Sequence, residues 1–144
     1  MALVEGGEGF AVHRTYLSPH GTGKAAIEPN KMMLGAVAGG AVRLSEGEDR
    51  LVVAEGIETA LSLASGLLHT AATVWAALST SGMTALRLPD EPAQLTIAPD
   101  GDKAGHSAAM TLAGRAARDG WSVSILTPPE GGDFNDLLRR EVMT

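Results

Sequence analysis

The chain has 144 residues, the length of one ordinary domain, so one hydrophobic core and one functional site are expected. Its apolar share of 44% is typical of a globular protein, whereas 18 Gly beside two Phe, one Tyr and two Trp disfavour an aromatic-rich all-β sandwich. The formal charge of −6 opposes unaided binding to a polyanion. The absence of cysteine excludes disulfides, thiolate zinc sites and Cys nucleophiles.

The start of the chain and its long uncharged stretch both argue against a targeting or membrane segment. The opening MALVEGGEGF lacks the basic stretch and apolar core of a secretion signal. The long uncharged stretch at 60–78 is interrupted by polar residues, so we expect a helix followed by a strand there and no membrane span. Together with the lack of cysteine, these features lead us to expect a cytoplasmic protein.

Residues 1–48 are expected to form a β-rich segment that precedes the main domain. The stretches 9–17 and 24–28, joined by SPHGTG, predict a β-hairpin. Residues 30–40 are apolar but interrupted by glycine, which favours a packed loop. A short strand is expected at 41–44.

Residues 49–144 alternate between strand and helix patterns. Short apolar runs predict strands at 51–54, 73–78, 94–98 and 121–126. Three- and four-residue periodicity and capping residues predict helices at 57–68, 79–86, 102–119 and 133–140. This alternation predicts an α/β fold: an open, mostly parallel four-stranded sheet flanked by helices, with the β-hairpin as an N-terminal extension.

Acidic residues directly follow two of the predicted strands. Glu55 follows 51–54, and Asp100 and Asp102 follow 94–98. Ligands of open parallel sheets bind beyond the carboxyl ends of the strands, so the three carboxylates are expected to converge if the two strands are neighbours. A hard cation such as Mg²⁺ would offset their mutual repulsion and hold phosphate beside them. The alternative interpretations are an N-cap for Asp102 and a turn residue for Asp100.

Further polar residues have both a functional and a structural interpretation. Asp133 and Asp136 fit the cap of the last helix, although Asn135 and Asp136 would face the metal if that helix lies near it. Lys103, and with it His106, either balances phosphate charge or belongs to a solvated first helical turn.

The remaining basic residues and histidines give weaker signals. His13, His20, His69 and His106 show no paired ligand spacing and are interpreted as surface or packing residues. Four basic residues of the N-terminal part either contact a phosphate backbone or serve only solubility: Arg14, Lys24, Lys31 and Arg43.

These segments resemble a known family. LVVAEGIETALSLA and LTIAPDGDKAGHSAAMTLA are similar to the glutamate and Asp-x-Asp motifs of the Toprim domain, the module shared by bacterial-type primases, topoisomerases and related nucleases. GGDFNDLLR resembles the closing segment of phage and plasmid primase-helicases. HRTYLSPHGTGKA and GAVRL resemble the β-rich segment before Toprim in those mobile-element proteins.

The resemblance implies roles for the acidic residues. Glu55 would be the general acid/base or a metal-linked carboxylate, and Asp100 and Asp102 would coordinate Mg²⁺ or Mn²⁺. Asp133 and Asp136 would be accessory, as would Lys103. Glu58 departs from the family pattern, where many members have aspartate, and is expected on the helix surface or behind the metal ligands.

The expected function is the catalytic Toprim portion of a DNA primase or primase-helicase, a nucleotidyltransferase of DNA replication. Its partners would be a single-stranded DNA template, nucleotides and other domains, with no membrane. The chain lacks a zinc-binding module, a helicase phosphate-binding loop and a basic priming subdomain, so we expect a part of a larger protein that is inactive alone.

Three alternatives stay open. A Toprim nuclease would use the same acids to cleave, and a non-catalytic module would bind metal and nucleic acid only. An unrelated Asp-x-Asp phosphotransferase ranks last, because Ala104 stands where such enzymes place a hydroxyl residue. Topoisomerase activity is not expected, because Tyr16 lies in the predicted hairpin.

Overall fold

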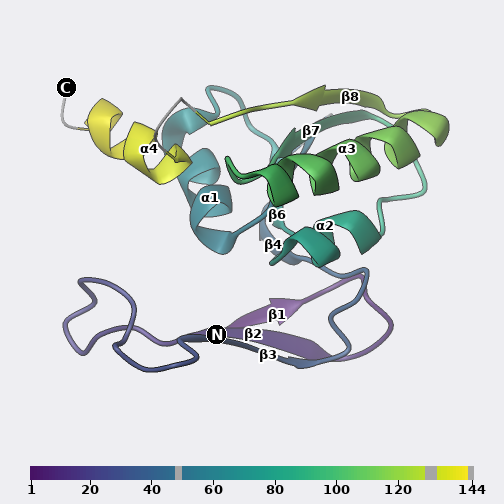
Figure 1. Cartoon of the computed structure of the whole chain (residues 1–144). Helices are drawn as coiled ribbons and strands as arrows, with labels where there is room; N and C mark the ends of the chain where they lie inside the picture. Colours follow the sequence, from purple (N-terminus) through teal and green to yellow (C-terminus); the bar gives the residue numbers. More distant parts are fainter. Residues whose placement is uncertain (48–49, 129–132, 143–144) are drawn as a thin grey trace.

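The computed structural model describes residues 1–47, 50–128 and 133–142 and contains two β-sheets (Figure 1). A small sheet at the N-terminal end lies against a larger sheet that carries the helices. The strands are β1 Ala2–Val4, β2 Ala11–Thr15, β3 Lys31–Gly35, β4 Val42–Ser45, β5 Arg50–Ala54, β6 Thr73–Ala76, β7 Gln94–Ala98 and β8 Ser122–Ile125. The helices are α1 Ile57–Ser62, α2 Thr80–Ala85, α3 Lys103–Arg118 and α4 Phe134–Val142, with a π-helical turn, η1, at Leu63–Leu67.

The larger sheet confirms the predicted α/β class. Its strand order is β4-β6-β5-β7-β8, and all neighbours are parallel except β4 and β6. The predicted number of four strands was wrong by one. The fifth strand is β4, which we expected as a short strand of the N-terminal part. It joins this sheet because it pairs with backbone N–H and C=O groups of β6 that would otherwise lie at the sheet edge, and because this pairing buries Val42 at 3% exposure.

Side chains that alternate along β5 fill two apolar layers. Leu51 and Val53 pack in the cluster under α2 and α3, whereas Val52 and Ala54 pack in the cluster beneath α1 and α4. All four are at most 5% exposed. Continuous burial of this kind is typical of a parallel strand covered on both faces, and it fixes the position at which β5 ends and the site begins.

The helices lie close to their predicted places, with one change of geometry. The helix predicted at 57–68 begins as α1 and continues as the π-helical turn η1, in which Gly66 has a φ of 155°. Glycine accepts this backbone conformation at little steric cost. In the described parts of the chain, no helix combines the length and the apolar character that crossing a membrane requires.

The N-terminal extension is a three-stranded antiparallel sheet of order β1-β2-β3, so the predicted hairpin forms only next to its turn and was wrong in its main pairing. The partner of β2 is β3, in the segment expected to be a loop, and 24–28 keeps only an isolated bridge between Leu17 and Lys24. We expected a loop there because glycine interrupts the segment, but one of these glycines is needed for the strand pairing. A Cβ on Gly35 would overlap the Phe10 carbonyl oxygen, so this glycine permits close pairing of the two strands.

The small sheet packs on the same side of the larger sheet as α1. Val4 and Ala11, at 3% and 0% exposure, belong to the same apolar cluster as Val42 and Val52. Glu5 and Ala41 exchange two backbone hydrogen bonds of 2.8 and 2.9 Å. The N-terminal segment is therefore fixed beside α1, and its side chains reach the carboxyl ends of the central strands.

Candidate functional site

Parallel pairing of β5 and β7 brings the first two acids together. Ala54 lies opposite Ala98 in the register, so the residues that follow each strand emerge at the same edge. The Glu55 N–H donates to the Ala98 carbonyl oxygen at 3.2 Å, and the Asp100 N–H donates to Glu55 Oε2 at 3.3 Å. Glu55 and Asp100 thus share one corner of the sheet.

Asp102 joins this corner through the start of α3. Its Oδ1 accepts a hydrogen bond of 2.7 Å from the Gly105 N–H, which makes it the N-cap of the helix. A Cβ on Gly105 would lie 2.7 Å from Glu55 Oε2 and 2.8 Å from the Asp100 carbonyl oxygen. The glycine therefore lets the first turn of α3 approach Glu55 closely, and the capping alternative for Asp102 describes its contact here.

The electrostatics show that the three carboxylates interact. Burial raises the pKa of Glu55, the Asp100 N–H opposes that rise, and the negative charges of Asp100 and Asp102 add to it. Burial also raises the pKa of Asp100, the hydroxyl of Thr59 opposes this, and the charge of Asp102 adds to it. A cation placed between them would relieve both effects.

Carboxylate oxygens are the ligands that Mg²⁺ prefers, so the donor chemistry of this corner fits that ion. Within the residues that the structure describes, however, no group of three His, Cys, Asp or Glu side chains is arranged to hold a metal ion. The three acids instead make the hydrogen bonds given above. Coordination by all three would require their side chains to turn toward a common point.

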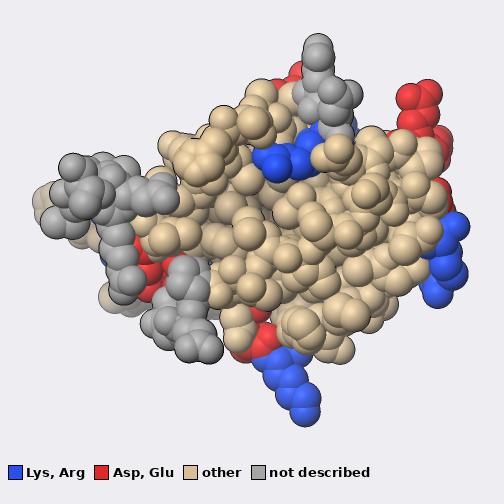
Figure 2. Space-filling model, turned by 90° about the horizontal axis from the view of Figure 1, so that it is seen from above, with Lys and Arg blue, Asp and Glu red and all other residues tan. Residues whose placement is uncertain are grey.

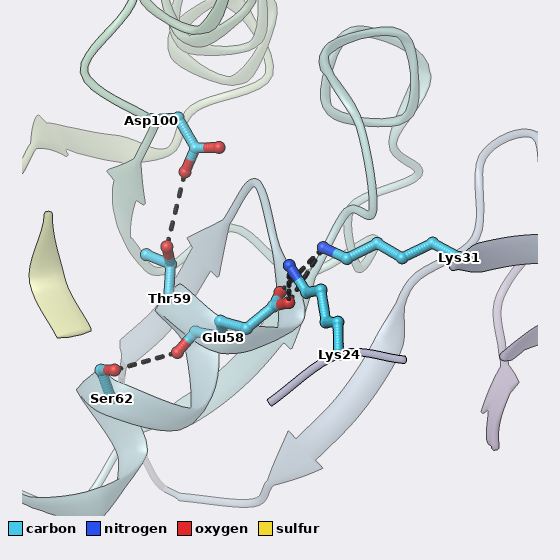
Figure 3. Close-up of polar contacts among 6 residues, drawn as sticks. All are labelled: Lys24, Lys31, Glu58, Thr59, Ser62 and Asp100. Carbon is cyan, nitrogen blue, oxygen red and sulfur yellow. Dashed lines mark hydrogen bonds and ion pairs between the residues drawn. The ribbon is translucent and has the colours of Figure 1, made fainter. Parts of the chain in front are cut away.

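A second group of charges lies beside the acids and links α1 to the N-terminal segment (Figure 3). Glu58 Oε1 lies 2.8 Å from Lys24 Nζ and 3.0 Å from Lys31 Nζ. Burial alone would raise the pKa of Glu58, but hydrogen bonds from the two ammonium groups lower it to about 2. The same contact raises the pKa of Lys24. Glu58 therefore stays ionised and holds two cations next to the acidic corner.

Asp100 and the cluster of Glu58, Lys24 and Lys31 line one groove with a volume of about 430 Å³, whereas Glu55 and Asp102 are not part of its described lining. The groove has room for the phosphates of a nucleotide. Its walls are Lys24, Lys31, Gly56, Glu58, Thr59, Asp100, Gly101, Pro128, Asp133, Phe134 and Asn135.

Other predicted residues are placed as follows. Asp133 and Asp136 form a reciprocal cap at the start of α4, with the Asp136 N–H 2.7 Å from Asp133 Oδ1. Asp133 and Asn135 line the groove. Lys103 and His106 are exposed on the first turn of α3, outside the described lining of the groove.

The basic residues named from the sequence divide into two kinds. Lys24 and Lys31 reach the groove, whereas Arg43 stacks on Trp75 with its guanidinium carbon 4.9 Å from the ring centroid. On the face that Figure 2 shows, Lys and Arg side chains of the described residues stand apart across a largely uncharged surface. Attraction to nucleic acid on that face would accordingly need cations or partner domains.

One contributor was not anticipated. The Thr59 hydroxyl donates to Asp100 Oδ1 at 3.4 Å, and the residue as a whole is only 8% exposed, so it helps to orient that carboxylate. The sequence contained a signal for it, since Thr59 lies four residues after Glu55, in the predicted helix that follows the strand.

The chain was compared with known proteins. The Toprim domain family matches residues 50–143, and a domain of unknown function, DUF7146, matches residues 1–44. A search of curated proteins finds no match. The crystal structure of a DNA primase domain from Pseudomonas aeruginosa superposes with a TM-score of 0.54 and 23% identity over 97% of this chain. The chain spans 52% of that structure, and the likeness shows a shared fold. With its strand-end acids and a family match over most of its length, the chain belongs to the Toprim domain family.

Proposed function

We propose that this chain is the Toprim catalytic portion of a DNA primase or primase-helicase of the phage or mobile-element type. It would bind Mg²⁺ or Mn²⁺ and position nucleotide phosphates for phosphodiester bond formation. The observation that carries the proposal is one groove lined both by Asp100, which contacts Glu55, and by Lys24 and Lys31. We also propose the division into an N-terminal segment, 1–48, and a Toprim domain, 49–144.

The acids have distinct proposed roles. Asp100 and Asp102 would hold the metal with Glu55, and the bound ion would neutralise phosphate charge in the transition state. A primer 3′ hydroxyl would attack the α-phosphorus, pyrophosphate would leave, and the hydroxyl proton would pass to Glu55. Burial raises the pKa of Glu55, which favours acceptance of that proton.

The lysines would bind the phosphates. In the structure, Lys24 and Lys31 form ion pairs with the Glu58 carboxylate at 2.8 to 3.0 Å. A phosphate oxygen makes the same kind of charge-assisted contact, so these ammonium groups could also bind phosphate. Asp133, Asp136 and Lys103 would be accessory. Catalysis would then rest mainly on positioning and electrostatic stabilisation.

The proposed partners are a single-stranded DNA template, nucleotides and further domains of a larger protein. The net charge of −6 supports the need for those domains, because the chain alone repels a polyanion. Activity of the chain by itself is not expected, and a cytoplasmic location remains a prediction.

The metal site is tested by NMR on the ¹⁵N-labelled chain. Trace Mn²⁺ should broaden the amide signals of 55–56 and 100–103, and excess Mg²⁺ should reverse this. Glu55→Gln and Asp100→Asn should weaken the effect. Asp90→Asn is the matched control, because Asp90 is exposed on the loop before β7 at the opposite strand ends. Broadening that is absent or centred elsewhere would refute the site.

The reaction is tested separately with single-stranded DNA, nucleoside triphosphates and Mg²⁺ in the presence of the remaining domains. New oligonucleotides that disappear with Glu55→Gln would support a primase. Metal-dependent nicking without synthesis would replace the proposal by a nuclease that uses the same acids.

A further inference from the structure

A second cavity opens between the small sheet and the helices α1 and α4, with a volume of about 670 Å³. Its lining is Met1, Ala2, His13, Thr15, Leu17, Gly23, Lys24, Ile57, Glu58, Leu61, Asn135 and Arg139. Lys24, Glu58 and Asn135 line the groove as well, so the two spaces meet at the Lys24–Glu58 ion pair. A ligand could therefore extend from one space into the other.

His13 presents an unused polar edge to this cavity. The residue lies on the central strand β2, opposite Ala2, and is only 4% exposed. Among the described residues its ring nitrogens have no hydrogen-bond partner, yet every fully buried side-chain nitrogen or oxygen there does have one. The ring nitrogens must then be open to the cavity that the residue lines.

The charge state of His13 defines what it can recognise. Burial lowers the pKa of His13, the positive charge of Lys31 lowers it further, and Glu58 opposes this. A neutral imidazole offers one N–H donor and one nitrogen acceptor. One ring nitrogen that faces the cavity can therefore donate to, or accept from, a single polar group of a neutral partner.

The walls around His13 are apolar and open to solvent. Ile57 and Leu61 of α1 line the cavity together with Leu17 of the N-terminal segment, and Leu61 and Leu17 are 47% and 61% exposed. Apolar walls with a few polar groups are typical of small-molecule sites, and the volume lies in the range that they occupy. Arg139 adds a cation to the lining.

We propose that the nucleoside half of a nucleotide binds in this cavity, with the base between the apolar walls and its polar edge at His13, while the phosphates pass Lys24 into the groove. The inference rests on the proposed function, since it names where the rest of the phosphate-bearing substrate lies. A nucleobase fits because it is flat, apolar on its faces and equipped with donors and acceptors on its edge.

The test uses the whole chain and three probes: ATP, adenosine and inorganic tripolyphosphate. ATP and adenosine should shift the imidazole ¹³C and ¹⁵N signals of His13, whereas tripolyphosphate should perturb only Lys24 and Lys31. Leu61→Trp fills the cavity from its exposed rim and should weaken ATP binding by about tenfold or more, with tripolyphosphate binding changed by less than about twofold. Met110→Trp, on the exposed face of α3, is the control and should bind ATP like the wild type.

The outcomes separate the two proposals. The base lies elsewhere if ATP binds no better than tripolyphosphate, if ATP leaves the His13 signals unchanged, and if Leu61→Trp binds ATP like the wild type. The cavity is then refuted while the phosphate groove stands. If neither ATP nor tripolyphosphate binds at millimolar concentration, the nucleotide function falls together with the cavity. The His13 readout needs no substitution, so it decides the matter even if Leu61→Trp fails to fold.

Discussion

Replacing Glu58 with Gln removes the carboxylate that ties two lysines of the N-terminal segment to α1. The amide keeps the size of the side chain but not its charge, so at neutral pH the ammonium groups 2.8 and 3.0 Å away lose their counter-ion. We expect Glu58→Gln to lower the free energy of unfolding, chiefly by weakening the contact between the N-terminal segment and α1.

The magnitude follows from the pKa of Glu58, which the two lysines lower from 4.5 to about 2 against the effect of burial. At about 1.36 kcal/mol per pKa unit this shift corresponds to roughly 3 kcal/mol for a fully buried group. The side chain is 43% exposed, and solvent screening reduces the expected loss to about 1–2 kcal/mol.

The pH dependence has a definite sign. Folded Glu58 binds its proton less tightly than in the unfolded chain, so its contribution is complete above pH 4.5 and is lost as the pH falls toward about 2. Urea unfolding of both proteins should therefore give a difference of about 1–2 kcal/mol at pH 7 and less than roughly half of that at pH 3. The difference between the two proteins isolates Glu58 from the other acids.

Glu8→Gln is the matched control. Glu8 forms a 2.8 Å ion pair with Arg87, but its side chain is 72% exposed, so the loss should stay below about 0.5 kcal/mol. A Glu58 effect no larger than the Glu8 effect, or one of equal size at pH 7 and pH 3, would refute the reasoning.

Five further substitutions, at four positions, test the packing around the site by equilibrium unfolding. Asp102→Ala should cost about 1 kcal/mol through loss of the helix cap, whereas Asp102→Asn keeps the cap and should cost less, although both should weaken Mn²⁺ broadening. Gly105→Ala should destabilise the chain because its Cβ would meet Glu55 Oε2 at 2.7 Å, whereas Gly114→Ala on the same helix meets nothing within 4 Å and should stabilise it by about 0.5–1 kcal/mol. Leu112→Ala empties a fully buried position of α3 and should cost about 2–5 kcal/mol.

Each of these has a result that would contradict it. Equal stability of Asp102→Asn and Asp102→Ala would mean that the capping hydrogen bond does not stabilise α3. A Gly105→Ala chain as stable as Gly114→Ala would mean that α3 does not approach Glu55 as closely as described. A loss below about 1 kcal/mol for Leu112→Ala would indicate a core that collapses around the vacated volume.

The central sheet was predictable because its strands are short apolar runs bounded by turn residues. β7 occupies the residues predicted for it, 94–98, and β5 differs by one residue at its start. Such runs can be recognised from the local sequence, since burial on both faces requires apolar residues in succession. The mostly parallel direction then followed from the alternation with helices, whereas the order of the strands required the structure.

The N-terminal segment was less predictable because its pairing is decided at a distance. Nothing local in 31–35 marks a strand, and its glycine favoured a loop, yet docking against β2 supplies the hydrogen bonds. Tertiary contact of this kind overrides local preference. The same distance hides the ion pairs of Glu58, whose partner Lys31 lies 27 residues away in sequence.

The acids were predictable for a geometric reason. Both Glu55 and Asp100 directly follow predicted parallel strands, so their convergence was expected if those strands were neighbours, and the structure supplies that pairing. The detailed contacts required the structure: the hydroxyl of Thr59 on Asp100, and the approach of Gly105 to Glu55.

Because the small sheet packs beside α1, the charged side chains of the groove come from two different portions of the chain. Its carboxylates all lie in the portion that matches the Toprim family, whereas both of its ammonium groups come from the portion that matches the other domain. Neither portion alone brings both signs of charge to this place. The mixed charge of the groove, with three carboxylates and two ammonium groups, therefore arises only where the two separately recognisable stretches of sequence pack together.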